Sequence, residues 1–201
     1  MRIVKLFGTA GAAALLAVAA AMPAQAAEMA NTQLKDSSGK AVGDVDLMQT
    51  PAGVLIKLQI KGLSPGEHAF HVHAVGKCEA PFESAGPHFN PGNHKHGIMS
   101  GEGHAGDMPN LHVPQSGELS VEIVNSSVSL EKGKPNSVFD NDGSALVIHA
   151  KADDYRSDPA GNAGDRIACG VIQPSGAPTV GASAPAPNTP AQRLRGEPSS
   201  K

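Results

Sequence analysis

Histidines are concentrated in one short part of this chain, and that concentration restricts the folds open to it. Residues 66–73 read Gly-Glu-His-Ala-Phe-His-Val-His, and the stretch that follows carries His88, His94, His96, His104 and Asp107. Imidazole and carboxylate groups gathered in this way are typical of a transition-metal site. The fold must therefore bring one strand-like run and one long loop together.

The His-x-His pair predicts how that run is oriented. Successive side chains on a strand point to opposite faces, so His71 and His73 share one face, while Phe70 and Val72 share the other. If the apolar pair fills a core, both imidazoles lie on its outer wall beneath the loop. His68 has the parity of the apolar pair, and we expect it to be a hydrogen-bonded structural histidine and not a ligand.

Short runs between turn signals indicate an all-β fold. Four strands are predicted between Met29 and His73, and turn signals separate them at residues 36–39, 50–53 and 63–66. Further strands are predicted at Glu118–Val124, Ala145–Ala150 and Arg166–Ile172. Residues 76–112 show no strand pattern, so we interpret them as a long functional loop. No segment has sustained helical periodicity, which favours a single β-barrel or sandwich domain.

The two ends of the chain differ from its middle. Residues 1–26 contain basic residues, an apolar run and a final Ala-x-Ala motif, which is typical of a secretory signal peptide. The domain is predicted to occupy residues 27–173, with no membrane span once the signal is removed. Residues 174–201 are rich in Ala, Pro, Ser and Thr and are predicted to form a disordered tail.

Cysteine content and charge narrow the function further. The only cysteines are Cys78 and Cys169, and an exported protein meets an oxidising compartment where two cysteines usually pair. The formal net charge is -3, which gives no indication of a nucleic-acid partner.

Four motifs resemble the copper/zinc superoxide dismutases and occur in that family's order. They are Gly-x-His-x-Phe-His-Val-His from Gly66, Ser-Ala-Gly-Pro-His-Phe-Asn-Pro from Ser84, His104-x-x-Asp107, and Gly-Asn-Ala-Gly-x-Arg-x-Ala-Cys-Gly from Gly161. The resemblance covers about residues 31–172, and the early Cys78 is similar to the bacterial exported branch. It implies an eight-stranded antiparallel Greek-key β-barrel with a long metal-binding loop.

The resemblance also implies one copper and one zinc per chain. The implied copper ligands are His71, His73, His88 and His149, and the implied zinc ligands are His88, His96, His104 and Asp107. His88 would bridge both metals. His94 stands two residues before His96 and is an alternative zinc ligand by position, but the family pattern Lys-His-Gly favours His96. His112 matches no ligand of the family and is predicted to lie at the surface.

Other roles follow from the same resemblance. Asp153 is implied to hydrogen-bond ligand histidines of both sites. Because a second aspartate, Asp154, is its neighbour, the alternative that Asp153 is a solvent-exposed aspartate in a turn stays open. Arg166 is implied to attract and orient the superoxide anion, and it joins His88 as a predicted catalytic residue. The implied activity converts superoxide to dioxygen and hydrogen peroxide by copper redox cycling, in the periplasm or elsewhere outside the cytoplasm.

Two other classes of function are weaker interpretations of the same residues. One is a module that buffers or delivers copper and zinc without turnover, and the other is a purely structural or interaction domain. The complete ligand set and Arg166 favour the enzyme over both. The sequence leaves a monomer and a homodimer equally open.

Overall fold

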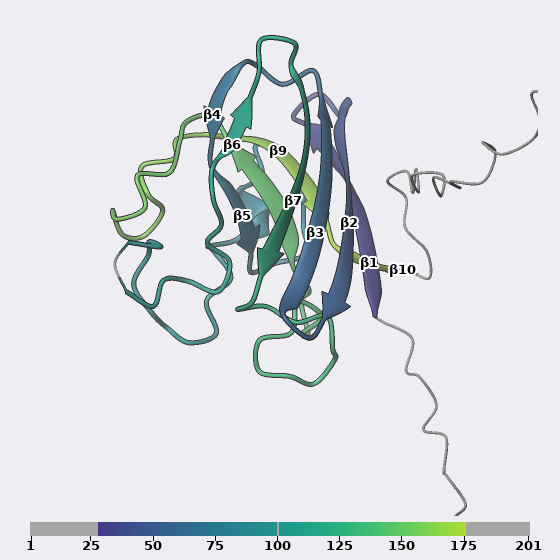
Figure 1. Ribbon diagram of the computed structural model, residues 1–201, viewed down its shortest axis with the longest axis vertical. Coiled ribbons are helices and arrows are strands. Elements are labelled where there is room, and N and C mark those ends of the chain that lie inside the picture. Colours follow the sequence, from purple (N-terminus) through teal and green to yellow (C-terminus); the bar gives the residue numbers. More distant parts are fainter. Residues whose placement is uncertain (1–27, 100, 176–201) are drawn as a thin grey trace, which may run out of the picture.

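The computed structural model describes residues 28–99 and 101–175, so the expected signal peptide and residues 176–201 of the expected tail lie outside it. Within this part, regular structure consists of ten strands and one 3-10 turn at Glu83–Ala85 (Figure 1). No helix in the described ranges has the length and apolar character needed to cross a membrane.

Eight strands form one antiparallel sheet. Along its hydrogen-bonded path the order is β5-β8-β9-β1-β2-β3-β7, and β10 also pairs with β1. Their bounds are Met29–Asp36 (β1), Ala41–Thr50 (β2), Gly53–Lys61 (β3), Phe70–His73 (β5), Glu118–Asn125 (β7), Ala145–His149 (β8), Arg166–Val171 (β9) and Gln173–Ser175 (β10). A separate antiparallel pair joins Gly66–His68 (β4) to Leu111–Val113 (β6). The all-β antiparallel class predicted from the sequence is confirmed.

Alternation of apolar and polar residues explains why the sheet curls around one core. On β3, Val54, Ile56, Leu58 and Ile60 are buried, and the residues between them are partly or fully exposed. Each such side chain taken out of water contributes about 1.5 to 3 kcal/mol. Phe70 on β5 packs in the same hydrophobic cluster, so the strand that carries the histidine pair is fixed against the core.

The long connections of the sheet position the site. β5 pairs with β8, more than seventy residues further along the chain, in a register that sets Phe70 opposite Ile148 and His73 opposite Ala145. His149 ends β8, where a register irregularity separates it from Ile148. Two strands distant in sequence therefore carry histidines to one place.

Three details differ from the strands predicted by sequence. The run ending at His73 is split into β4 and β5 at Ala69, whose N–H donates to the carbonyl of Lys151. β6 lies partly inside the stretch predicted to have no strand, and β10 includes Pro174 and Ser175, which the sequence predicts to lie in the tail. Backbone pairing with β1 holds β10, and such pairing leaves little signature in side-chain composition.

Candidate metal centre

The structure brings six histidines and one aspartate into two overlapping groups. The four-histidine group contains His71, His73, His88 and His149, and the histidine–aspartate group contains His88, His96, His104 and Asp107. Within each group, one potential ligand atom of every residue lies within 4.8 Å of the others. These are the two sets expected to hold copper and zinc, and His88 belongs to both.

Backbone bonds hold the long loop against β5. Val72 donates to the carbonyl of Gly106 at 3.0 Å, and Phe89 donates to the carbonyl of Val72 at 2.8 Å. The contact is so close that a Cβ on Gly106 would overlap the carbonyl oxygen of Val72. Single bridges also pair His73 with His88 and His71 with Asp107. The ligands on the loop are thus placed by main-chain pairing with the strand beneath.

Hydrogen bonds at the back of three imidazoles fix which nitrogen faces the four-histidine group. His71 donates through Nε2 to Oδ2 of Asp153 at 2.7 Å, and His73 donates through Nδ1 to the carbonyl of Gly86 at 2.9 Å. His149 donates through Nδ1 to the carbonyl of Gly164 at 3.2 Å. Because a neutral imidazole has one N–H, the opposite nitrogen of each ring keeps a free lone pair. Nε2 of His73 and Nε2 of His149 lie 3.3 Å apart.

Several ring nitrogens are buried without any hydrogen-bond partner in the described part of the chain. They are Nδ1 of His71, Nε2 of His88, Nδ1 of His96 and Nδ1 of His104. A buried polar atom left unpaired costs free energy, and such atoms are rare in folded proteins. All four belong to the two groups, so their lone pairs are available to a metal ion. The donor atoms present therefore fit the two metals that the sequence predicts.

The histidine–aspartate group converges on one carboxylate oxygen. Oδ1 of Asp107 lies 3.0 Å from Nδ1 of His88, 3.1 Å from Nδ1 of His96 and 3.4 Å from Nδ1 of His104. Oδ2 accepts the backbone N–H groups of Gly97 and His104, each at 2.9 Å. Three imidazoles and one carboxylate make a closed four-ligand set, the pattern of a structural zinc site.

Electrostatics suits the four-histidine group to ligation. Burial lowers the pKa of His71 to about 4 and the pKa of His149 to about 3, and it also holds the pKa of His73 well below its usual value. These rings are consequently neutral near pH 7, as metal ligation requires. Burial alone would raise the pKa of Asp107, but the nearby imidazoles of His88 and His96 and two backbone N–H groups hold that pKa well below its usual range.

Asp153 lies behind both groups. Its side chain is 1% exposed. Oδ2 of Asp153 accepts the hydrogen bond from Nε2 of His71, and Oδ1 lies 3.0 Å from Nε2 of His96. Asp154 is exposed and instead accepts hydrogen bonds from Ser157 and Asn162. Of the two adjacent aspartates, Asp153 is thus the one that connects a histidine of each group.

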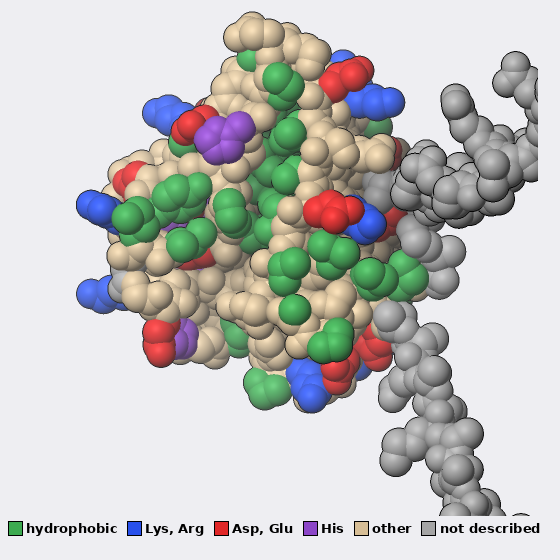
Figure 2. Space-filling view, viewed as in Figure 1, with side chains coloured by type: hydrophobic (Ala, Val, Ile, Leu, Met, Phe, Trp, Pro, Cys, Tyr) green, Lys and Arg blue, Asp and Glu red, His purple; other side chains and the backbone are tan. Residues whose placement is uncertain are grey.

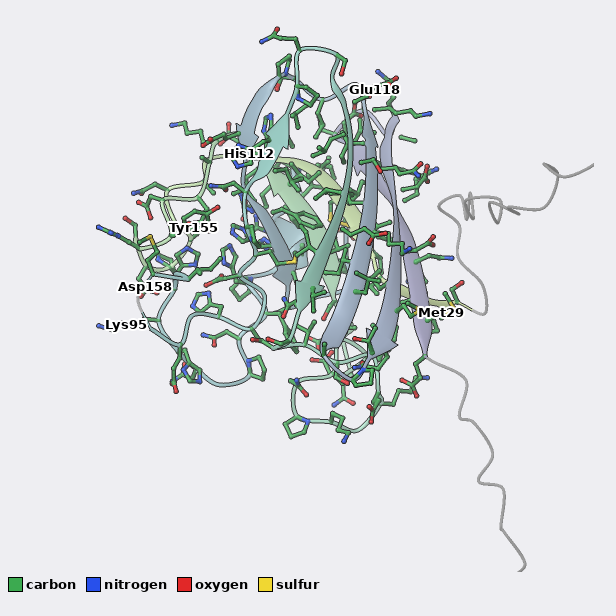
Figure 3. All side chains as sticks on the ribbon, viewed as in Figure 1. Met29, Lys95, His112, Glu118, Tyr155 and Asp158 are labelled. Carbon is green, nitrogen blue, oxygen red and sulfur yellow. A yellow bond between two sulfur atoms is a disulfide. The ribbon has the colours of Figure 1, made fainter. Side chains whose placement is uncertain are left out.

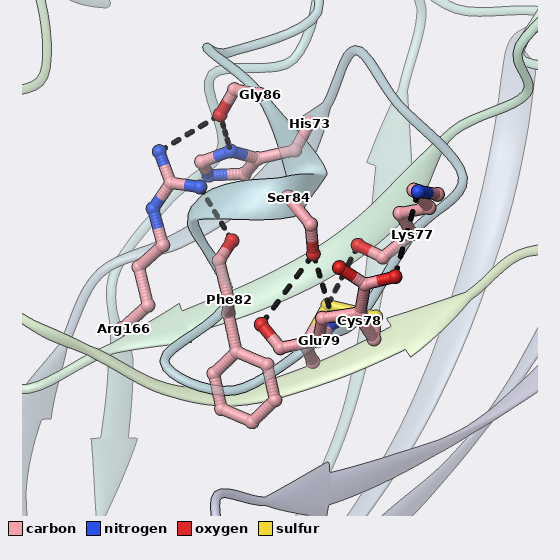
Figure 4. The surroundings of a disulfide bond; sticks show 9 residues. His73, Lys77, Cys78, Glu79, Phe82, Ser84, Gly86 and Arg166 are labelled. Carbon is pink, nitrogen blue, oxygen red and sulfur yellow. Dashed lines mark hydrogen bonds and ion pairs between the residues drawn. A yellow bond between two sulfur atoms is a disulfide. The ribbon is translucent and has the colours of Figure 1, made fainter.

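Arg166 opens β9 at the edge of the four-histidine group. Its guanidinium donates to the carbonyl of Phe82 at 2.7 Å and to that of Gly86 at 2.8 Å (Figure 4). The disulfide between Cys78 and Cys169 ties the segment that carries these carbonyls to β9. The pairing of the two cysteines expected from the sequence is confirmed.

The remaining histidines lie apart from the two groups. His94 contacts Glu102 at 2.6 Å with its side chain 35% exposed, and His96 occupies the group instead. His112 is 72% exposed beside Glu67, and Figure 3 shows it on the outside of the molecule. Histidine side chains reach the face shown in Figure 2 only as small separate patches. His68 is buried, and its two ring nitrogens contact the carbonyls of His149 and Ser64. The structural position predicted for His68 and the surface position predicted for His112 are both observed.

Some contributors to the site were not predicted. The carbonyls of Gly86 and Gly164 orient His73 and His149, and Glu83 lies 3.7 Å from Arg166. Backbone acceptors carry no residue-type signal. The carboxylate of Glu83 is visible in the sequence, but its partner Arg166 lies more than eighty residues further along the chain.

Comparisons with known proteins agree with this geometry. Residues 41–172 match the family model described as copper/zinc superoxide dismutase (SODC). Superoxide dismutase [Cu-Zn] 1 of Aquifex aeolicus is 52% identical over 146 residues, which are 71% of this chain and 86% of the relative. Extracellular superoxide dismutase [Cu-Zn] of Haemonchus contortus is 41% identical over 142 residues, covering 66% of this chain and 74% of the relative. The crystal structure of a SOD-like protein from Bacillus subtilis superposes with a TM-score of 0.68 at 41% identity, covering 70% and 96% of the two chains.

Proposed function

This chain belongs to the copper/zinc superoxide dismutase family, and from that membership we propose how its residues divide the work and where the protein acts. The enzyme converts two superoxide anions and two protons into dioxygen and hydrogen peroxide. The observation that carries this function is the pair of ligand groups that share His88.

Each group has a distinct task in this assignment. His71, His73, His88 and His149 hold copper, and His88, His96, His104 and Asp107 hold zinc. Bound copper supplies two accessible oxidation states, whereas zinc supplies a fixed positive charge and orders the loop. The donor types support this division, since imidazole nitrogens suit copper, and a closed set containing a carboxylate suits structural zinc.

His88 is the proposed proton donor. Its Nε2 is buried and has no hydrogen-bond partner in the described chain, and its Nδ1 lies against Asp107. A proton held at Nε2 therefore lies where the four-histidine group meets the substrate. Imidazole is the side chain whose ordinary pKa allows it both to give and to accept a proton near neutral pH.

Arg166 is the proposed substrate guide. Its guanidinium is held by two carbonyls and its side chain is 14% exposed, so the charge is fixed in place but still reachable from solvent. A fixed cation at the edge of the site attracts the superoxide anion and orients it. Asp153 supports the reaction indirectly, by keeping His71 and His96 in the tautomers that leave Nδ1 free.

We further propose that residues 1–26 are a cleaved export signal and that the enzyme acts in the periplasm or otherwise outside the cytoplasm. A disulfide between the only two cysteines supports an oxidising compartment. The match to an extracellular relative supports the same location. Residues 27–173 would then form the functional domain.

One experiment tests the activity directly. The chain from Ala27 is purified, copper and zinc are quantified, and superoxide dismutation is followed against ionic strength in the same sample. Rapid turnover at about one copper and one zinc per chain, slowing as salt screens Arg166, is the expected result. Full loading with both metals and no turnover would overturn the enzyme in favour of a metal-buffering protein.

A further inference from the structure

The side chain of Asn110 makes two hydrogen bonds with the backbone of Asp153. Its side-chain N–H donates to the carbonyl of Asp153 at 2.9 Å, and its side-chain oxygen accepts the N–H of Asp153 at 2.8 Å. Asn110 follows the ligand Asp107 by three residues, so the two hydrogen bonds join the end of the metal-binding loop to the loop that follows β8.

Tyr155 completes the arrangement. The backbone N–H of Asn110 donates to the Tyr155 hydroxyl at 2.7 Å, and the backbone N–H of Tyr155 donates to Oδ1 of Asp153 at 2.7 Å. Tyr155 has a left-handed backbone with φ 62°, and Figure 3 shows it on the loop that follows β8. Asp153 is thus held at its N–H, its carbonyl and its carboxylate.

We propose that Asn110 is a positioning residue of the metal centre, acting through Asp153 on His71 and His96. The inference rests on the metal assignment given above, and none of its readouts requires turnover. Both oxygens of Asp153 are already used, one on each histidine, so a small shift of its backbone weakens the two contacts together. A side chain that fixes this backbone therefore fixes the tautomer and ring angle of one ligand in each group.

The chain offers a matched comparison for this role. Asn90 makes the same pair of hydrogen bonds with the backbone of His94, donating at 2.8 Å and accepting at 3.0 Å. Asn90 also lies on the metal-binding loop, but no hydrogen bond joins it to Asp153 in the described part of the chain. Asn110→Ala and Asn90→Ala therefore delete the same chemistry, and only the first releases Asp153.

The test follows imidazole protons by NMR in the reduced, copper- and zinc-loaded protein, which is diamagnetic. The Nε2–H groups of His71 and His96 donate hydrogen bonds to the carboxylate of Asp153. The Nδ1–H group of His73 donates to the carbonyl of Gly86, and its proton is an internal control. In Asn110→Ala we expect water exchange of the His71 and His96 protons to accelerate by about tenfold or more, since the hydrogen bond of each to the charged Asp153 carboxylate is weakened. The His73 proton should exchange at its original rate.

A second readout is zinc release to a chelator, which we expect to become easier by about 10- to 100-fold in Asn110→Ala. Asn90→Ala should leave exchange of the His71 proton unchanged. If Asn110→Ala does not fold, Asn110→Asp keeps the acceptor for the Asp153 N–H, and its exchange rates should then lie above wild type. Unchanged exchange of the His71 proton in a folded Asn110 variant, or equal acceleration in Asn90→Ala, would overturn the proposal whatever the turnover of the wild-type enzyme.

Discussion

His73 and Arg166 donate hydrogen bonds to the same carbonyl oxygen, at 2.9 and 2.8 Å respectively. That oxygen belongs to Gly86, two residues before His88 (Figure 4). One backbone atom thus sets the orientation of an imidazole of the four-histidine group and the position of the Arg166 guanidinium. Displacing this segment should alter both substrate attraction and ligand geometry.

Arg166→Ala should slow dismutation by about tenfold or more at low salt, because the fixed positive charge at the site is lost. The salt dependence of the rate should weaken in parallel, while copper and zinc contents stay at wild-type levels. Lys61→Ala removes one exposed charge at the end of β3 and is the control. A rate equal to that of wild type in Arg166→Ala would show that this arginine does not guide the substrate.

His149→Ala should lose copper and activity and keep zinc, because His149 belongs to the four-histidine group alone. His104→Ala is the reciprocal variant, since His104 belongs only to the histidine–aspartate group. It should release zinc preferentially. Metal analysis of both purified variants provides the measurement, and an equal loss of the two metals in each variant would contradict the assignment.

Gly161→Ala should loosen zinc and lower the free energy of unfolding. Gly161 has φ 61°, and a Cβ there would overlap the carboxylate of Asp153 and lie 2.7 Å from Nε2 of His96. Gly133→Ala is the matched control, because Gly133 has φ 81° with no atom within 4 Å of an added Cβ. The free energy of unfolding of the Gly133→Ala control should fall by about 1 kcal/mol from backbone strain alone. Denaturant unfolding should show a larger fall in the free energy of unfolding for Gly161→Ala than for Gly133→Ala. Chelator competition should show easier zinc release only for Gly161→Ala.

Replacing Cys78 and Cys169 together by serine should lower the free energy of unfolding by about 2 to 5 kcal/mol. The bond links positions 91 residues apart, so its loss also frees the segment whose carbonyls hold Arg166. Turnover per bound copper should fall as well. Denaturant unfolding of the double variant and of the disulfide-bonded wild type, both without reductant, measures the effect. Equal free energies of unfolding for the two proteins would contradict the expectation.

Side-chain periodicity was sufficient to orient the strand at the centre of the site. Phe70 and Val72 lie in the core as their parity predicts, and His71 and His73 occupy the opposite face beneath the loop. The information was local, because alternation along a strand depends only on neighbouring residues. The two ligand sets and the disulfide were predicted by resemblance to the family, and the structure brings both together.

Contacts made by the backbone could not be predicted in the same way. β10 and the carbonyls of Gly86 and Gly164 depend on main-chain groups, which every residue possesses. The bonds between Asn110 and Asp153 join positions 43 residues apart and have no spacing rule. The catalytic roles of His88 and Arg166 stay predictions.

The sharing of His88 and Asp153 between the two groups has a thermodynamic consequence. Binding one metal should fix the ring of His88 and the carboxylate behind His71 and His96, so the second metal would meet a site already ordered. Coupling between two binding equilibria is reciprocal, and any factor by which zinc tightens copper is the factor by which copper tightens zinc. The pair should therefore load cooperatively, and chains that carry a single metal should be depleted relative to empty and full ones.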